Sequence, residues 1–306
     1  MLLPFIGFRA REHFGPDGPR TTTRYDTDQS GRIEYRFNAL GYRGEEFDPD
    51  AKRHIYVCGC SYMFGLGVDY TETAAYKFKR LYADAHGLAP EQVNLLNFSM
   101  GSASNDYIGR TLVSQMMRKK PDLVVAAYTH LTRAEYVNAG DLGPHVYAIG
   151  PWYTFREKWD ERLTQAQQVD VEGVDSADAL DFLIEAGMGY YTYYTDDLGV
   201  LSFLRNALMV QLLCEKLRVP YVAALADWQR FWSALDGFAS GPLAAALDKS
   251  VFIPPSEMRP PMPEAEFLQR LKDDVAADGI HFGGWYHGYF AQKFLDVYRQ
   301  KYLEQR

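Results

Sequence analysis

Short, mainly apolar runs alternate with amphipathic stretches through much of the chain. The runs at 55–59, 93–98 and 121–128 contain few polar positions, which is typical of parallel strands covered on both faces. Apolar residues at helical spacing follow two of these runs, at 72–86 and 105–118. The pattern therefore predicts repeated strand–helix units, with a parallel sheet between two layers of helices.

The same alternation returns in the last third of the chain. A helix is predicted at 203–217, a fourth strand at 220–225, and a loop with a helix at 227–235. Two further helices are predicted at 264–276 and 288–302. Ligands of such sheets bind at the carboxyl ends of the strands, so the segments that follow the strands are where chemistry is expected.

Two regions interrupt this pattern. Residues 1–50 lack sustained apolar periodicity, and we expect an irregular N-terminal arm on a main domain of residues 51–306. Residues 139–198 mix helical and Tyr-rich pieces, and we expect an insertion or lid over the site. Aromatic residues crowd between Tyr147 and Tyr194, which suits either a substrate cleft or a protein interface.

Composition narrows the classes of partner. The hydrophobic share of 47% and the charged share of 24% are those of a globular protein. A formal net charge of −8 without long basic clusters argues against nucleic acid. No stretch is seen to approach the ~20 apolar residues of a membrane span, and the apolar N-terminus is too short for a signal peptide, so we expect a cytoplasmic protein. The oligomeric state stays open.

Cys58 and Cys60 lie two apart on one side of the first predicted strand, which raises a Cys-x-Cys metal or redox site as an alternative. No Cys or His cluster at ligand spacing completes such a site, so buried thiols are the favoured interpretation and no metal is expected. Cys60 could itself be a nucleophile. Strand alternation opposes this, because it sends Cys60 and Ser61 in opposite directions.

Ser61 directly follows the first predicted strand. A hydroxyl there is a candidate nucleophile if a base removes its proton, although serine is also a common helix cap. Asp278 and His281, three apart in a short turn, can form the activating pair, or else a helix cap beside an exposed histidine. His287 does not join them at metal-ligand spacing, because 283–285 has the composition of a loop.

Several segments resemble blocks of the SGNH (GDSL-like) hydrolases: 59–68 the first block, 97–105 the second, 278–281 the last, and 38–44 an element that precedes the first block in many bacterial members. The resemblance covers roughly residues 35–130 and 200–300. It implies a flavodoxin-like three-layer α/β/α sandwich. It also implies an esterase or acyltransferase with a serine nucleophile, a small acylated substrate and no cofactor.

Carried to matching positions, the resemblance implies Ser61 as nucleophile, His281 as base, Asp278 as its orienting carboxylate and Gly101 as a second oxyanion donor. The third block, which normally contains an Asn donor, is altered at 128–133. The residues that could supply the missing donor are Asn105, Thr129, His130 and Arg133. In the first block, Cys60 replaces the usual Asp.

Two interpretations of the altered third block stay open. Arg133 could bind a carboxylate or phosphate of the substrate, or it could form a surface pair with Glu135. The missing donor also favours an alternative function, a catalytically weak or silent SGNH-fold protein that binds a small molecule or a partner through the Tyr-rich insertion.

Overall fold

A parallel four-stranded sheet forms the centre of the protein. The computed structural model describes residues 23–25, 33–140, 143–150, 177–226, 241–279 and 281–304. The sheet strands are β3 (Arg53–Gly59), β4 (Val93–Asn97), β5 (Leu123–Tyr128) and β8 (Tyr221–Leu225). They lie in the order β4-β3-β5-β8, all parallel. Because the first strand of this sheet lies between the second and the third, the topology is flavodoxin-like.

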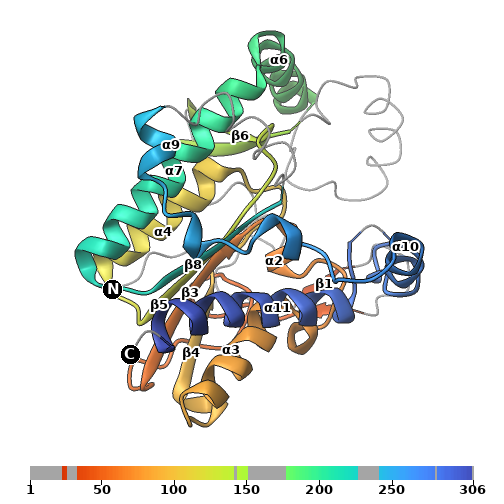
Figure 1. Ribbon diagram of the computed structural model, residues 1–306. Coiled ribbons are helices and arrows are strands. Elements are labelled where there is room, and N and C mark those ends of the chain that lie inside the picture. Colours follow the sequence, from red (N-terminus) through yellow and green to blue (C-terminus); the bar gives the residue numbers. More distant parts are fainter. Residues whose placement is uncertain are drawn as a thin grey trace.

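Helices cover both faces of the sheet (Figure 1). On one face α3 (Ala74–Ala85) packs against α11 (Gly284–Tyr298), and on the other α4 (Asn105–Arg118) packs against α7 (Asp196–Leu217). The predicted three-layer α/β/α sandwich is therefore confirmed.

The strand β3 shows how the sequence pattern produces two cores. Ile55 and Val57 belong to the hydrophobic cluster that includes α3 and α11, whereas Tyr56 and Cys58 belong to the cluster that includes α4 and α7. Successive side chains of a strand point to opposite faces, so an uninterrupted apolar run supplies both clusters at once.

The helices α7 and α11, in the C-terminal half of the chain, begin earlier than predicted. The helix expected from 203 begins at Asp196, because the Thr195 hydroxyl accepts a hydrogen bond from the Leu198 N–H and caps it. The helix expected from 288 begins at Gly284, so the interpretation of 283–285 as a loop was wrong for two of those three residues. There the Asp274 carboxylate accepts hydrogen bonds from two backbone N–H groups of the first turn.

An antiparallel hairpin occupies the start of the expected insertion. Its strands are β6 (Ala134–Gly140) and β7 (Gly143–Ile149), and α6 (Ala177–Tyr193) follows later in the chain. The sequence pattern did not predict the hairpin. Residues 151–176 and the helix expected at 227–235 lie outside the described residues.

Shorter elements complete the description. In the N-terminal arm two strands pair antiparallel, β1 (Thr23–Tyr25) and β2 (Ile33–Tyr35). The remaining short helices are α2 (Ser61–Phe64), α9 (Pro242–Ala246) and α10 (Glu264–Asp273), with single helical turns at 70–72, 90–92, 249–251, 255–257 and 299–303.

By length and composition alone, α7 could cross a membrane, contrary to the expectation from the sequence. Just over half of its most apolar window, 56%, is buried inside the protein. Asn206 on α7 donates to the Asp106 carboxylate on α4, and Gly109 of α4 leaves room for the Asn206 side chain. The apolar character of α7 is thus accounted for in large part by its role as a core helix.

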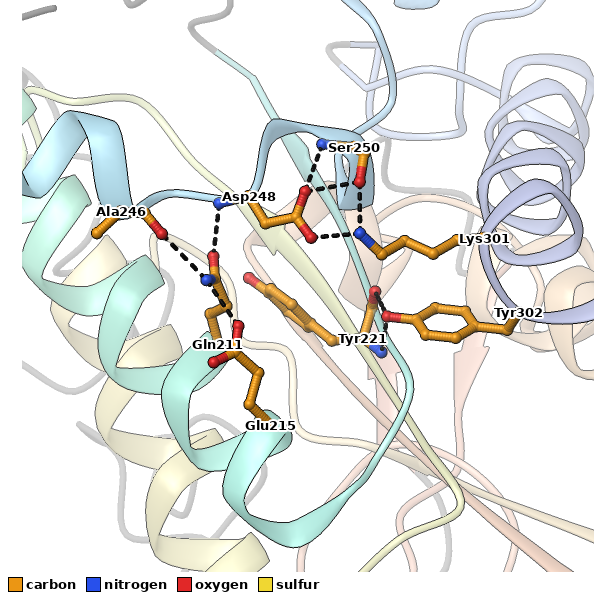
Figure 2. Close-up of polar contacts among 8 residues, drawn as sticks. All are labelled: Gln211, Glu215, Tyr221, Ala246, Asp248, Ser250, Lys301 and Tyr302. Carbon is orange, nitrogen blue, oxygen red and sulfur yellow. Dashed lines mark hydrogen bonds and ion pairs between the residues drawn. The ribbon is translucent and has the colours of Figure 1, made fainter. Parts of the chain in front are cut away.

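The C-terminal segment closes the outer edge of the sheet next to β8 (Figure 2). The Tyr302 hydroxyl accepts from the Tyr221 N–H and donates to the Tyr221 carbonyl, both at 3.1 Å. Lys301 donates to the Asp248 carboxylate and the Ser250 hydroxyl. Further along β8, the Ile253 N–H donates to the Ala223 carbonyl at 2.8 Å. These contacts occupy backbone groups that an open strand edge would expose.

Replacing Tyr302 with Phe tests this closure. The substitution removes one hydroxyl that satisfies two backbone groups of β8, so we expect Tyr302→Phe to lower the free energy of unfolding by about 1 kcal/mol. Urea unfolding measures the change. Tyr193→Phe is the control, because the Tyr193 side chain is 83% exposed and its loss of a hydroxyl should leave stability unchanged. Equal stability of the two variants would contradict the proposed role of Tyr302.

Candidate active site

Ser61 stands at the junction of β3 and α2, at the carboxyl edge of the sheet. It is the first residue of α2, with Cys60 at the N-cap and no side-chain cap hydrogen bond. The Ser61 side chain is therefore not a helix cap. The short helix ends at Gly65, which adopts a left-handed φ of 81° and turns the chain back toward the sheet.

The structure brings Ser61, His281 and Asp278 together. The Ser61 Oγ lies 2.8 Å from His281 Nε2, although the two residues are 220 positions apart. His281 Nδ1 lies in hydrogen-bond contact with Asp278 Oδ2, and Asp278 Oδ1 accepts from the His281 backbone N–H at 3.0 Å. The side chains of Asp278 and His281 are 4% and 14% exposed. Since a carboxylate only accepts, Nδ1 carries the proton and Nε2 is free to accept from the serine hydroxyl.

Arg43 holds the turn that follows Ser61. Its side chain is fully buried and donates to the backbone carbonyls of Phe64, Gly65 and Val68. The guanidinium also lies over the Tyr35 ring, 4.3 Å from the ring centroid. Burial lowers the pKa of Arg43 to about 10, which still leaves it charged at neutral pH.

Other groups fix the same turn from different sides. Asn97 donates from Nδ2 to the Met63 carbonyl at 2.8 Å, and the Gly67 N–H donates to the Tyr35 hydroxyl at 2.8 Å. The Ala277 N–H donates to the Gly67 carbonyl, which docks the turn against the Asp278 loop. Gly67 has φ of 74°, and a Cβ there would lie 3.0 Å from the Asp278 carboxyl carbon. Only glycine allows this approach without displacement.

Gly101, the predicted second oxyanion donor, lies in the turn between β4 and α4. A Cβ placed on it would lie 3.7 Å from Leu66, so this turn borders the segment that follows Ser61. The next residue, Ser102, adopts a left-handed φ of 59°, which is uncommon for a residue with a side chain. The Met100 N–H donates to the Gly59 carbonyl at 3.2 Å and ties this turn to the end of β3.

The four residues considered as replacements for the third-block Asn have different surroundings. Asn105 is engaged with the Thr129 backbone at both ends of its amide: Oδ1 accepts from the Thr129 N–H at 2.8 Å, and Nδ2 donates to the Thr129 carbonyl at 3.3 Å. The buried Thr129 hydroxyl accepts from Arg133 Nη1 at 3.0 Å. Of the four candidates, His130 lines an apolar cavity, and Cys60 lines the same cavity.

Glu135 pairs with Arg110, so the suggested Arg133–Glu135 surface pair was wrong. Arg110 Nη2 and Nε lie 2.7 and 3.1 Å from the two Glu135 carboxylate oxygens. Arg110 projects from α4 toward β6, whereas Arg133 precedes β6 and turns back to Thr129. Arg110, the partner of Glu135, lies on the helix α4. The spacing of residues along the strand could therefore not reveal this pair.

Cys58 and Cys60 are free, buried thiols on the same side of the sheet. Burial raises the pKa of Cys58 well above its usual value, so it stays a neutral thiol. In the part of the chain that the structure describes, no group of three or more His, Cys, Asp or Glu side chains could hold a metal ion.

A second imidazole, that of His287, lies near the site on α11. Nδ1 accepts from the Ala74 N–H at 3.1 Å, and the ring is 4% exposed. Burial, together with the positive charges of Lys77 and Arg43, lowers the pKa of His287 to about 3. His287 is therefore neutral at pH 7, with its proton on Nε2.

Sequence reasoning missed the roles of Arg43, Asn97 and Tyr35. Arg43 and Asn97 lie within segments that resemble known blocks, but nothing in their spacing shows which carbonyls they reach. A charged residue inside a stretch that otherwise packs as core is the one signal that could have drawn attention to Arg43.

The fold and the site define an α/β protein with serine, histidine and aspartate hydrogen-bonded in series at the carboxyl edge of a parallel sheet. No protein-family model matches the chain. No curated protein matches it either. The structural similarities that follow are therefore similarities of fold.

Solved structures of lipases and esterases are similar to this chain. A lipase from a goat rumen metagenome covers 80% of this chain and 97% of its own, at 13% identity and a TM-score of 0.41. A GDSL-like lipase from Parabacteroides merdae covers 84% and 100%, at 9% identity and 0.42. A catalytic mutant of the acetylxylan esterase Axe2 from Geobacillus stearothermophilus covers 82% and 96%, at 12% identity and 0.39.

The substitution Arg43→Lys tests whether the hydrogen bonds of Arg43 stabilise the turn after Ser61. Lysine offers one nitrogen where arginine uses two, so some of the three carbonyls lose their donor, and we expect the free energy of unfolding to fall by about 2–4 kcal/mol. Chemical unfolding measures the loss, with Arg118→Lys on the exposed end of α4 as the control. A loss no larger than that of the control would show that the turn does not depend on Arg43.

The buried neutral state of His287 predicts a pH dependence of stability. Its pKa in the folded protein, about 3, lies below the ~6.5 of an unfolded chain, so the unfolded state binds the extra proton between these values. Stability should therefore decline as pH falls from about 6.5 toward 3. We expect His287→Gln to decline less steeply than the wild type in unfolding experiments across this range. Parallel curves would contradict a buried neutral imidazole.

Proposed function

We propose that the protein is an SGNH-type serine ester hydrolase or acyltransferase acting on a small acylated substrate. The observation that carries the proposal is the 2.8 Å contact between Ser61 Oγ and His281 Nε2, with Asp278 behind the ring. A nucleophile, a base and an orienting carboxylate in series are the arrangement that acyl transfer through a serine requires.

In the first half-reaction, Ser61 Oγ attacks the ester carbonyl carbon while its proton passes to His281 Nε2. The resulting oxyanion would accept hydrogen bonds from backbone N–H groups, for which Ser61 and Gly101 are the candidates. The imidazolium then gives the proton to the leaving oxygen as the C–O bond of the ester breaks. The alcohol departs, and the acyl group stays bonded to Ser61 Oγ. Asp278 holds the ring and stabilises its charged form throughout.

The second half-reaction mirrors the first. Water, or an acceptor alcohol in a transferase, gives its proton to His281 Nε2 as its oxygen bonds to the acyl carbon. The Ser61 Oγ–carbon bond breaks, Oγ recovers the proton, and the acid or new ester leaves. Hydrolysis and transfer use the same side chains and differ in which nucleophile the site admits. No step needs a cofactor, and we propose a cytoplasmic protein.

A catalytically silent SGNH-fold binding protein is the second candidate. It is favoured by one specific observation: both ends of the Asn105 amide are engaged with the Thr129 backbone, so this candidate for the missing oxyanion donor is already occupied. Loss of one oxyanion donor typically costs about 10²–10³ in rate, which weakens an enzyme without silencing it. The tyrosines of the insertion, of which Tyr190, Tyr191 and Tyr194 pack together, would then serve binding.

A fluorophosphonate probe separates the two candidates. An activated serine reacts with it, so we expect one label per chain at Ser61 and none in Ser61→Ala. Asp278→Asn should label and turn over p-nitrophenyl acetate more slowly by on the order of 10⁴, because the ring loses its orientation. Ser250→Ala, whose hydroxyl contacts Asp248 and Lys301 and no residue of the proposed site, should label like the wild type. Correctly folded wild-type protein that takes no label would favour the silent binder.

A further inference from the structure

An apolar ridge runs along the outer side of α7. Side chains that recur at intervals of three or four residues form it, all of them exposed: Leu198, Leu201, Arg205, Met209, Leu212 and Lys216. The four apolar members are between 39% and 57% exposed. A single exposed leucine is common on a protein surface, whereas apolar side chains aligned along one helix mark a candidate interface.

Two neighbouring helices flank this ridge. α7 packs against both α4 and α9 (Figure 1), and each of these carries an exposed apolar residue of its own, Met117 at 69% and Leu243 at 45%. From Leu198 to Lys216 the ridge is about 27 Å long, and at a helix diameter of about 10 Å it covers roughly 300 Å². Since a stable interface takes about 800 Å² from each partner, the flanking helices must contribute to an interface built here.

The two ends of the ridge carry opposite charges. Exposed acids lie in the first turn of α7 and exposed bases at its end: Asp196, Asp197, Lys216 and Arg218. Glu215, an acid within the last turn, is bound by the Gln211 amide at 2.9 Å. The ridge is therefore acidic at one end, apolar in the middle and basic at the other end.

This distribution of charge favours a second copy of the chain over a membrane as the partner. An anionic membrane attracts surfaces rich in Lys and Arg, and the acids at one end of the ridge oppose this, as does the net charge of −8. Two copies related by a two-fold axis perpendicular to α7 would place the two helices antiparallel. Each acidic end then lies against the basic end of the other copy, whereas parallel helices would bring like charges together.

We propose that α7 is the centre of an antiparallel two-fold interface between two copies of this chain. Leu201 of each copy packs against Leu212 of the other, and Asp197 of each copy pairs with Lys216 of the other. The Arg205 guanidinium is already bound to Asp106 at 3.1 Å, so its hydrocarbon stem is what it offers to the other copy. This dimer does not depend on the proposed enzymatic activity.

Leu212→Glu tests the apolar part of the interface. We expect the wild type to be a dimer at about 10 µM, and the variant to dissociate at least ~100-fold more readily, because each dimer would bury two unpaired carboxylates. Sedimentation equilibrium measures both dissociation constants. Leu268→Glu is the matched control, because Leu268 is 49% exposed on α10, far from α7 in Figure 1. It should dimerise like the wild type.

Two charge reversals test the antiparallel pairing at low ionic strength. Asp197→Lys sets lysine against lysine twice in its own dimer, and Lys216→Glu sets glutamate against aspartate twice. Each variant alone should therefore dimerise about tenfold more weakly than the wild type. An equimolar mixture of the two should recover wild-type affinity, because the mixed dimer pairs opposite charges at both ends.

Three outcomes would contradict the dimer: a wild type that stays monomeric at about 100 µM, a Leu212→Glu variant that dimerises as the wild type does, or charge variants that regain no affinity on mixing. A monomer that pellets with phosphatidylglycerol vesicles would assign the ridge to a membrane surface instead. If Leu212→Glu does not fold, Leu201→Glu takes its place and should weaken the dimer to the same extent.

Discussion

The guanidinium of Arg43 is buried among backbone carbonyls, and the geometry of the site depends on it. Three carbonyls from the turn after Ser61 accept its hydrogen bonds. A buried charge is stable only when dipoles or counter-charges replace water, so the turn cannot move away without stranding the charge. The charge of Arg43 in turn holds those three carbonyls in one orientation. The N-terminal arm thereby positions the nucleophile, although it contributes nothing to the hydrogen-bonded series itself.

The Asp278 loop is also held in place by hydrogen bonds, but here they join backbone groups and involve no buried charge. The Ala276 N–H donates to the His281 carbonyl at 2.9 Å, which closes the loop on itself. Asp274, at its start, accepts from the first N–H groups of α11. The loop is thus held between a helix start on one side and the Gly67 carbonyl on the other. Because the loop is anchored on both sides, the imidazole of His281 is presented to Ser61 before any substrate arrives.

Two imidazoles a few residues apart are set to different tasks by their surroundings. His281 has a carboxylate on one nitrogen and a hydroxyl on the other, so it can hold and pass a proton. His287 has a backbone donor on one nitrogen and an apolar cavity around the ring, so burial keeps it neutral and leaves it a donor. His281 is thereby suited to acid–base chemistry, whereas His287 serves the packing of α11 against the start of α3.

The sequence by itself determined the layers of the protein and the local half of the site. Short, mainly apolar runs identified all four strands of the central sheet, since a parallel strand must bury both faces. Asp278 and His281 could be paired because they are three residues apart. Only the tertiary structure decided which distant groups meet: Ser61 with His281, Arg43 with its carbonyls, Glu135 with Arg110, and Asp274 with the start of α11. Periodicity reports which side chains are buried, whereas the partner of a long or polar side chain depends on which elements pack together, and that information does not lie in local spacing.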